Sequence, residues 1–159
     1  MRFYLGVLFC LIGLSAFIAE KAKASEDIVA VQSVANGNLT TKCEISTVES
    51  EGYALQVRVT QDFKELNIGG FVQLWSDDEG LLKLIERAAG ASFEESKSAA
   101  RNYQILYSVF SKGSDGSLIE TPIQGYGKRN IESKFPHTQP LIELIDRFCN
   151  TDAKAFSDR

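Results

Sequence analysis

Three cysteines and one histidine are the most reactive side chains of this chain. Cys43 lies in LTTKCEISTV (39–48) and Cys149 in TQPLIELIDRFC (138–149), whereas Cys10 belongs to an apolar run near the N-terminus. Neither Cys43 nor Cys149 has a second cysteine or a histidine at the spacing of a metal site, so a metal centre is not expected. A disulfide between Cys43 and Cys149 is the more plausible chemistry.

The hydrophobic periodicity around both cysteines directs them into the interior. Side chains in 39–48 alternate as in a half-buried strand, and Cys43 lies on the apolar side. Residues 138–149 have helical spacing, and Cys149 lies on the apolar stripe. In an exported chain this predicts a Cys43–Cys149 disulfide, with two free buried thiols as the alternative. A loop of about 100 residues contributes about 4.7 kcal/mol in the loop-entropy model.

Residues 1–24 are predicted to be a cleaved signal peptide. Their apolar run, 5–19, would be roughly 22 Å long as a helix, which is short of the ~30 Å hydrocarbon core of a membrane. Small side chains favour cleavage after Ala24, with cleavage after Ala19 or an uncleaved anchor as alternatives. Bulky residues before Cys10 argue against lipid attachment. We therefore expect an exported protein, with the periplasm favoured and an extracellular location as the alternative.

The net charge of the chain limits the classes of partner that are expected. The formal net charge is −4 at pH 7, and removal of the basic segment 1–24 makes the chain more acidic. An acidic surface repels phosphate backbones and anionic lipid headgroups, so we expect no nucleic-acid partner and, after cleavage, no membrane partner. Asn38-Leu39-Thr40 is a glycosylation sequon that matters only in a eukaryotic host.

Residues 25–149 are predicted to form a single α+β domain, followed by a polar tail at 150–159. Alternating hydrophobicity and turn residues predict an antiparallel sheet of about five strands. These strands are 39–48, 53–61, 71–75, 103–110 and 117–124. Pro122 in the last of them favours a position at the sheet edge.

Two helices, or three, are expected to pack on one face of this sheet. The first follows a capping box at Ser76 and Glu79, and Gly90 ends it. Residues 91–101 are predicted to be a further short helix. The C-terminal helix, with Thr138 as its N-cap, would be tied to the first predicted strand by the disulfide. Asp146 and Arg147 are placed on its solvent side.

Catalytic motifs are scarce. His137 is the single histidine, and no nucleophile or carboxylate is placed beside it by a recognisable motif. It is interpreted as a residue of the helix entry. Asp77, Asp78 and Glu79 are explained by a helix N-terminus, where acids are stabilised, and their spacing does not match a calcium loop. We therefore predict no catalytic residue, no metal and no cofactor.

The stretch GYGKR (125–129) is the best candidate binding segment. Two glycines permit a tight turn or close approach to a ligand. Lys128 and Arg129 can bind an anionic group, and Tyr126 can act as an aromatic anchor. The alternative is a tight turn with solvated charges.

The leading functional hypothesis is a small exported binding or accessory protein without enzymatic activity, which recognises a protein or a small ligand. One alternative is an exported hydrolase whose site is assembled from carboxylates and His137. A second alternative is an accessory protein tethered by an uncleaved segment 1–24. A buried pocket containing His137 and Glu132 would favour the hydrolase.

Overall fold

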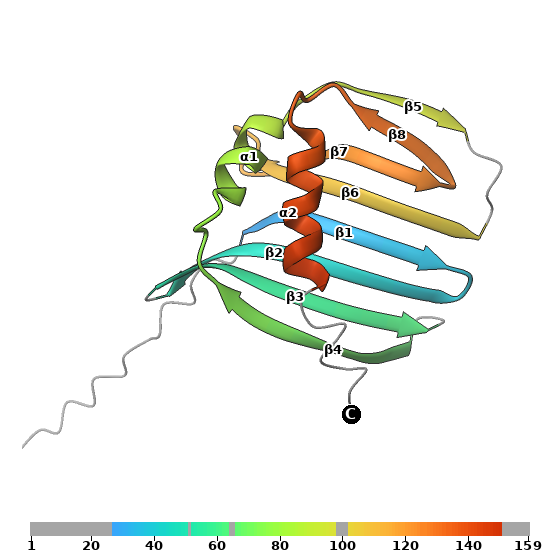
Figure 1. Cartoon of the computed structure of the whole chain (residues 1–159), viewed down its shortest axis with the longest axis horizontal. Helices are drawn as coiled ribbons and strands as arrows, with labels where there is room; N and C mark the ends of the chain where they lie inside the picture. The colour runs from blue at the N-terminus through green and yellow to red at the C-terminus, as the bar shows by residue number, and fades with distance from the viewer. Residues whose placement is uncertain (1–26, 51, 64–65, 98–101, 151–159) are drawn as a thin grey trace, which may run out of the picture.

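An antiparallel sheet with two helices on one face is the framework of the molecule (Figure 1). The computed structural model describes residues 27–50, 52–63, 66–97 and 102–150, and within them the sheet has eight strands. The strands are β1 (Ile28–Asn36), β2 (Leu39–Ser50), β3 (Tyr53–Phe63), β4 (Leu66–Trp75), β5 (Phe93–Lys97), β6 (Tyr103–Lys112), β7 (Leu118–Gly127) and β8 (Arg129–Ser133). The helices are α1 (Leu81–Ala88) and α2 (Thr138–Asn150).

The strand order is β4-β3-β2-β1-β6-β7-β8-β5, and every pairing is antiparallel. The meanders β1–β4 and β6–β8 meet where β1 pairs with β6. Gln32 on β1, for example, lies opposite Cys43 on β2 and Tyr107 on β6. This order leaves β4 and β5 as the two edges, which lie at opposite ends of the sheet in Figure 1.

The hydrophobic core lies between the sheet and the helices. Alternate residues of the central strands point toward the helices, and the apolar stripes of α1 and α2 pack onto them. The fully buried side chains of this core include Ile45, Val57, Val109, Leu81, Leu141 and Ile145. The predicted α+β class, the antiparallel sheet and the shared face of the helices are thereby confirmed.

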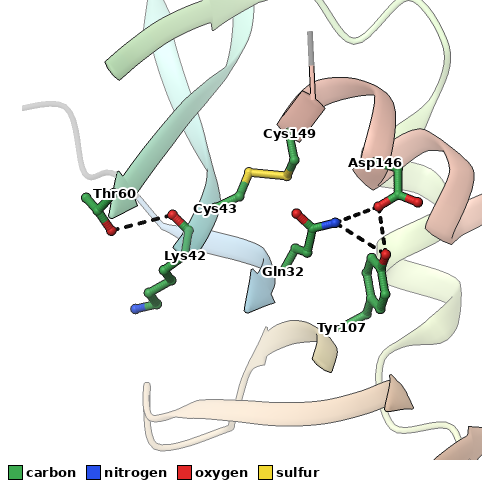
Figure 2. Close-up of a disulfide and its surroundings, with 7 residues drawn as sticks. All are labelled: Gln32, Lys42, Cys43, Thr60, Tyr107, Asp146 and Cys149. Atoms are coloured by element: carbon green, nitrogen blue, oxygen red, sulfur yellow. Dashed lines mark hydrogen bonds between the residues drawn. A yellow bond between two sulfur atoms is a disulfide. The ribbon is translucent and has the colours of Figure 1, made fainter. Parts of the chain in front are cut away.

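The predicted disulfide is present. Cys43 on β2 and Cys149 on α2 are bonded, with 5.8 Å between their Cα atoms and a sequence separation of 106 (Figure 2). Cys43 lies on the second strand in chain order and not on the first, as was predicted, because β1 precedes it. The bridge joins α2 to the half of the sheet that contains β4.

Strand number is where the sequence prediction was wrong, since five strands were expected. β1 was missed because the apolar residues of IVAVQSVAN do not alternate with polar ones, and only its middle residues Ala30–Gln32 are buried. Residues 93–97 form β5 and not part of a short helix, because pairing with β8 outweighs their local helical preference. β7 is also not an edge, since it lies between β6 and β8, and Pro122 is accommodated beside a bulge.

Both helix starts differ from the predicted caps. Ahead of α1, the carboxylate of Asp77 accepts hydrogen bonds from the backbone amides of Leu81 (2.7 Å) and Leu82 (3.2 Å), so Asp77 satisfies the helix start in place of the predicted capping box. At α2, the carbonyl of His137 accepts the first helical bond, from Leu141. Thr138 is therefore inside the helix, and its hydroxyl donates to the carbonyl of Phe135.

Candidate functional site

A cleft of about 420 Å³ lies on the β5–β8–β7 part of the sheet. Pairing of Tyr107 with Gln124, and of Gln124 with Glu132, places these side chains on one face of the sheet. That face also carries α2, because the Tyr107 hydroxyl bonds to this helix. The side chains on this face of the cleft are Glu94, Ser96, Gln124, Tyr126, Asn130 and Glu132.

The charges of the cleft are unequally neutralised. Glu94 forms an ion pair with Lys134 at 2.7 Å, and this hydrogen bond is the main cause that raises the pKa of the Lys134 ammonium. Glu132 adds a smaller electrostatic contribution in the same direction. Among the described residues, the side-chain carboxylate of Glu132 has no hydrogen-bond or ion-pair partner. Its carboxylate is therefore the acid of the cleft that is free to meet a cationic ligand.

The structure places the predicted binding residues Tyr126, Lys128 and Arg129 in three different environments. Tyr126 on β7 lines the cleft and is 51 % exposed. Lys128 lies in the turn between β7 and β8, where its backbone amide donates to the carbonyl of Tyr103 at 2.9 Å. Arg129 begins β8, and two of its nitrogens donate to Glu95, each at 2.7 Å.

Register separates Tyr126 from Arg129. Gly125 pairs with Ile131, so Arg129, two residues before Ile131, lies on the face opposite Tyr126. The turn itself requires Gly127, which has φ 100° and where a Cβ would lie 2.2 Å from the Tyr103 carbonyl oxygen. Tyr126 is therefore the member of the GYGKR segment that contributes to the cleft.

Sequence reasoning missed the polar residues that accompany Tyr126. Glu94 lies on β5, whereas Asn130 and Glu132 lie on β8, and neither strand was predicted. Four of the five residues in Phe93–Lys97 are polar and all five are exposed, so there is no hydrophobic alternation from which a strand could be predicted. Their convergence depends on the pairing of β5 with β8 and of β8 with β7.

His137 lies apart from the residues that line this cleft. It is exposed at the start of α2, as predicted, and its ring makes an edge contact with Phe135 at 5.7 Å between centroids. Among the residues that line the cleft there is no histidine. Glu132 lines the cleft and His137 does not, so this cleft is not the pocket with both residues that would favour the hydrolase alternative.

A buried polar cluster joins α2 to the middle of the sheet, next to the disulfide (Figure 2). The side-chain amide of Gln32 donates to Asp146 at 2.6 Å and to the Tyr107 hydroxyl at 3.3 Å, and that hydroxyl donates to Asp146 at 2.7 Å. Asp146 was expected to face water, but its carboxylate accepts these bonds from β1 and β6. Burial is the main cause that raises the pKa of Tyr107 to about 12.

The other predicted solvent-side residue of α2 behaves as expected. Arg147 is exposed and forms an ion pair with Glu79, at the loop before α1. This contact links the two helices at the surface. The acids at 77–79 therefore have structural partners: Asp77 caps α1, Asp78 accepts from the Ser76 hydroxyl, and Glu79 binds Arg147.

Comparison with known proteins returned no match to a family model, a curated protein or a solved structure. Within the described ranges, His, Cys, Asp and Glu form no group of three or more that could hold a metal ion. Neither described helix is long and apolar enough to cross a membrane. The predicted signal peptide 1–24 and all of the tail except Asn150, which ends α2, lie outside the described residues.

Proposed function

We propose that this chain is an exported, non-enzymatic binding protein whose β5–β8–β7 cleft takes a cationic group carried by a peptide or a small ligand. The observation that carries the proposal is the Glu132 carboxylate, which lines the cleft without an ion-pair partner among the described residues. The exposed ring of Tyr126 lines the same cleft, and an aromatic face beside a carboxylate favours a guanidinium or ammonium group.

The cleft also offers neutral hydrogen-bonding groups. Gln124 and Asn130 contribute carboxamides and Ser96 contributes a hydroxyl, and these groups can bind the polar parts of a peptide. Glu94 is held by Lys134, so the charge that remains for a ligand is close to that of a single carboxylate. A ligand with one positive charge therefore fits better than a polycation.

The test is an NMR titration with N-acetyl-arginine amide, using N-acetyl-citrulline amide as a neutral probe of the same shape. We expect amide shift changes in β5, β7 and β8 with the arginine probe, and much smaller changes with citrulline. Glu132→Gln should abolish the difference between the probes, whereas Glu86→Gln, an exposed acid on α1, should leave it unchanged. Equal responses to both probes, or none, would overturn the proposal. Binding should also weaken with salt, because exposed charges are screened over about 8–10 Å.

The export part of the proposal is supported by the signal-like segment 1–24 and by the disulfide, since such bonds persist in oxidising compartments. Expression of the full chain in a bacterium, followed by intact mass measurement, tests it. We expect a mature protein that begins at Ser25. A mass that retains residues 1–24, with the protein in the membrane fraction, would favour the tethered alternative.

A further inference from the structure

The face of the sheet that carries α2 is only partly covered by this helix. In Figure 1, β1, β6 and β7 continue past α2 toward the end of the sheet where β7 turns into β8. Exposure along β6 follows this boundary. Tyr107, whose hydroxyl bonds to Asp146 of α2, is 7 % exposed, whereas Tyr103, on the same face, is 41 % exposed. The helix-side face therefore continues beyond α2 as an open surface.

Apolar side chains gather on this open surface. Ile105 on β6 pairs with Val34 on β1 and with Tyr126 on β7, and both aliphatic side chains are half-buried. Tyr103 precedes Ile105 by two residues, so it is a diagonal neighbour of Tyr126. Diagonal neighbours lie about 7–8 Å apart, which is within reach of aromatic side chains. Tyr103, Ile105, Val34 and Tyr126 therefore form a continuous apolar tract.

The apolar tract adjoins the cleft, because Tyr126 belongs to both. Glu132 pairs with Gln124, two residues before Tyr126, so Glu132 is the diagonal neighbour of Tyr126 on the other side of β7. Glu132, Tyr126 and Tyr103 thus follow a diagonal line across β8, β7 and β6. Each step of this line is about 7–8 Å, and two residues of an extended chain span about 6.6–6.8 Å. Alternate side chains of an extended peptide therefore match its spacing.

We propose that the cleft and the apolar tract together bind an extended peptide segment with a basic residue two positions from an aromatic or large aliphatic residue. This rests on the proposed function, since the basic side chain occupies the cleft. Its charge meets Glu132 beside the ring of Tyr126. The apolar side chain covers Ile105, between the rings of Tyr126 and Tyr103.

Charge complementarity argues for this kind of peptide. The Glu132 carboxylate lies at one end of the line, and Lys128 belongs to the other, because its backbone amide donates to the Tyr103 carbonyl at 2.9 Å. A second cation is therefore disfavoured at the Tyr103 end, where an uncharged apolar side chain fits. An acidic segment would be repelled by Glu132 and by the net charge of −4. A wholly apolar segment would leave Glu132 without a partner.

NMR titration of the oxidised chain with short peptides tests the proposal. The probes are N-acetyl-Arg-Ser-Phe amide and its reversed sequence, N-acetyl-Phe-Ser-Arg amide, each compared with a version that has serine in place of phenylalanine. We expect phenylalanine to tighten binding at least about fivefold in one order or the other, because burial of apolar surface is favourable. The shift changes should then extend from β7 and β8 to β6 near Tyr103. No gain from phenylalanine in either order would overturn the proposal.

Variants of the apolar tract locate the effect. Tyr103→Ser should remove the gain from phenylalanine, whereas Tyr103→Phe, which keeps the ring, should retain it. Tyr53→Ser is the matched control, because Tyr53 is a similarly exposed tyrosine at the start of β3, outside the cleft and the tract. Equal loss in Tyr103→Ser and Tyr53→Ser would overturn the proposal.

Replacement of arginine by citrulline in the same peptides separates this inference from the proposed function. If the protein prefers arginine to citrulline but gains nothing from phenylalanine, the cleft binds a cation and the apolar tract is not part of the site. If there is no preference for arginine, the proposed function fails, and this inference fails with it. Tyr103→Ser should leave the preference for arginine intact, since Glu132 is unchanged.

Discussion

The two edge strands of the sheet, β5 and β4, differ in the charged side chains that protect an edge against the addition of further strands. β5 carries Glu94, Glu95 and Lys97, and Glu94 and Glu95 are held in ion pairs by Lys134 and Arg129. β4 carries no charge at all and exposes valine and leucine. Because charged edge strands resist the addition of further strands, β5 carries a protection that the uncharged residues of β4 do not provide.

The edges also differ in how they are anchored. Trp75 at the end of β4 packs edge-on against Phe148 of α2, with 5.3 Å between the ring centroids, and Phe148 is adjacent to the bridged Cys149. β5 is held mainly by pairing with β8 and by ion pairs at the surface. The β4 side therefore depends on packing and a covalent bond, whereas the β5 side depends on weaker, exposed contacts.

The largest expected effect concerns the disulfide. The double variant Cys43→Ala with Cys149→Ala should lower the free energy of unfolding by about 2–5 kcal/mol, because the unfolded chain gains freedom. Hydrogen exchange should increase more in β2, β3 and β4 than in β5 and β8, since the bridge joins α2 to β2. Denaturant unfolding and exchange mass spectrometry measure the two effects. A uniform increase in exchange would contradict the proposed difference between the edges.

A smaller effect on stability is expected from the polar cluster of Gln32, Tyr107 and Asp146, which involves β1 and β6 at the junction of the two halves of the sheet. The pKa of Tyr107 rises from 10.0 to about 12 in the folded state, so its stabilising contribution is complete below pH 10 and is lost as the pH rises through 12. A shift of this size corresponds to about 2–3 kcal/mol. Tyr107→Phe should remove this part of the alkaline destabilisation, measured by denaturation between pH 9 and about 12. Unlike loss of the disulfide, it should affect exchange in β1 and β6 alike.

The smallest effect is expected at the β5 edge. Arg129→Gln removes an exposed ion pair with Glu95, and such pairs contribute little because water and salt screen them. We expect the unfolding midpoint to change hardly at all, while amide exchange in β5 increases. Arg87→Gln, on the exposed side of α1, is the matched control and should leave β5 unchanged. A large loss of global stability would show that this edge is not held by weak contacts.

Local sequence patterns were sufficient to predict the strands and helices that bury one face and expose the other to water. Alternation identified the inward face of β2, on which Cys43 lies, and helical spacing identified the stripe of α2 that ends at Cys149. Both patterns follow from which side of an element faces water, so they can be read without knowing the partner element. The disulfide could be predicted for the same reason, since two inward thiols at the ends of one domain can meet in its core.

Tertiary structure decided everything that depends on which strand lies beside which. β1 could be recognised only from its two neighbouring strands, because its apolar residues show no alternation. β5 became a strand because β8 supplied its hydrogen bonds, and Asp146 turned inward because Gln32 and Tyr107 offered donors. The cleft with Glu132 and the uncharged edge at β4 share this origin. Both depend on contacts between segments far apart in the chain, which no local pattern encodes.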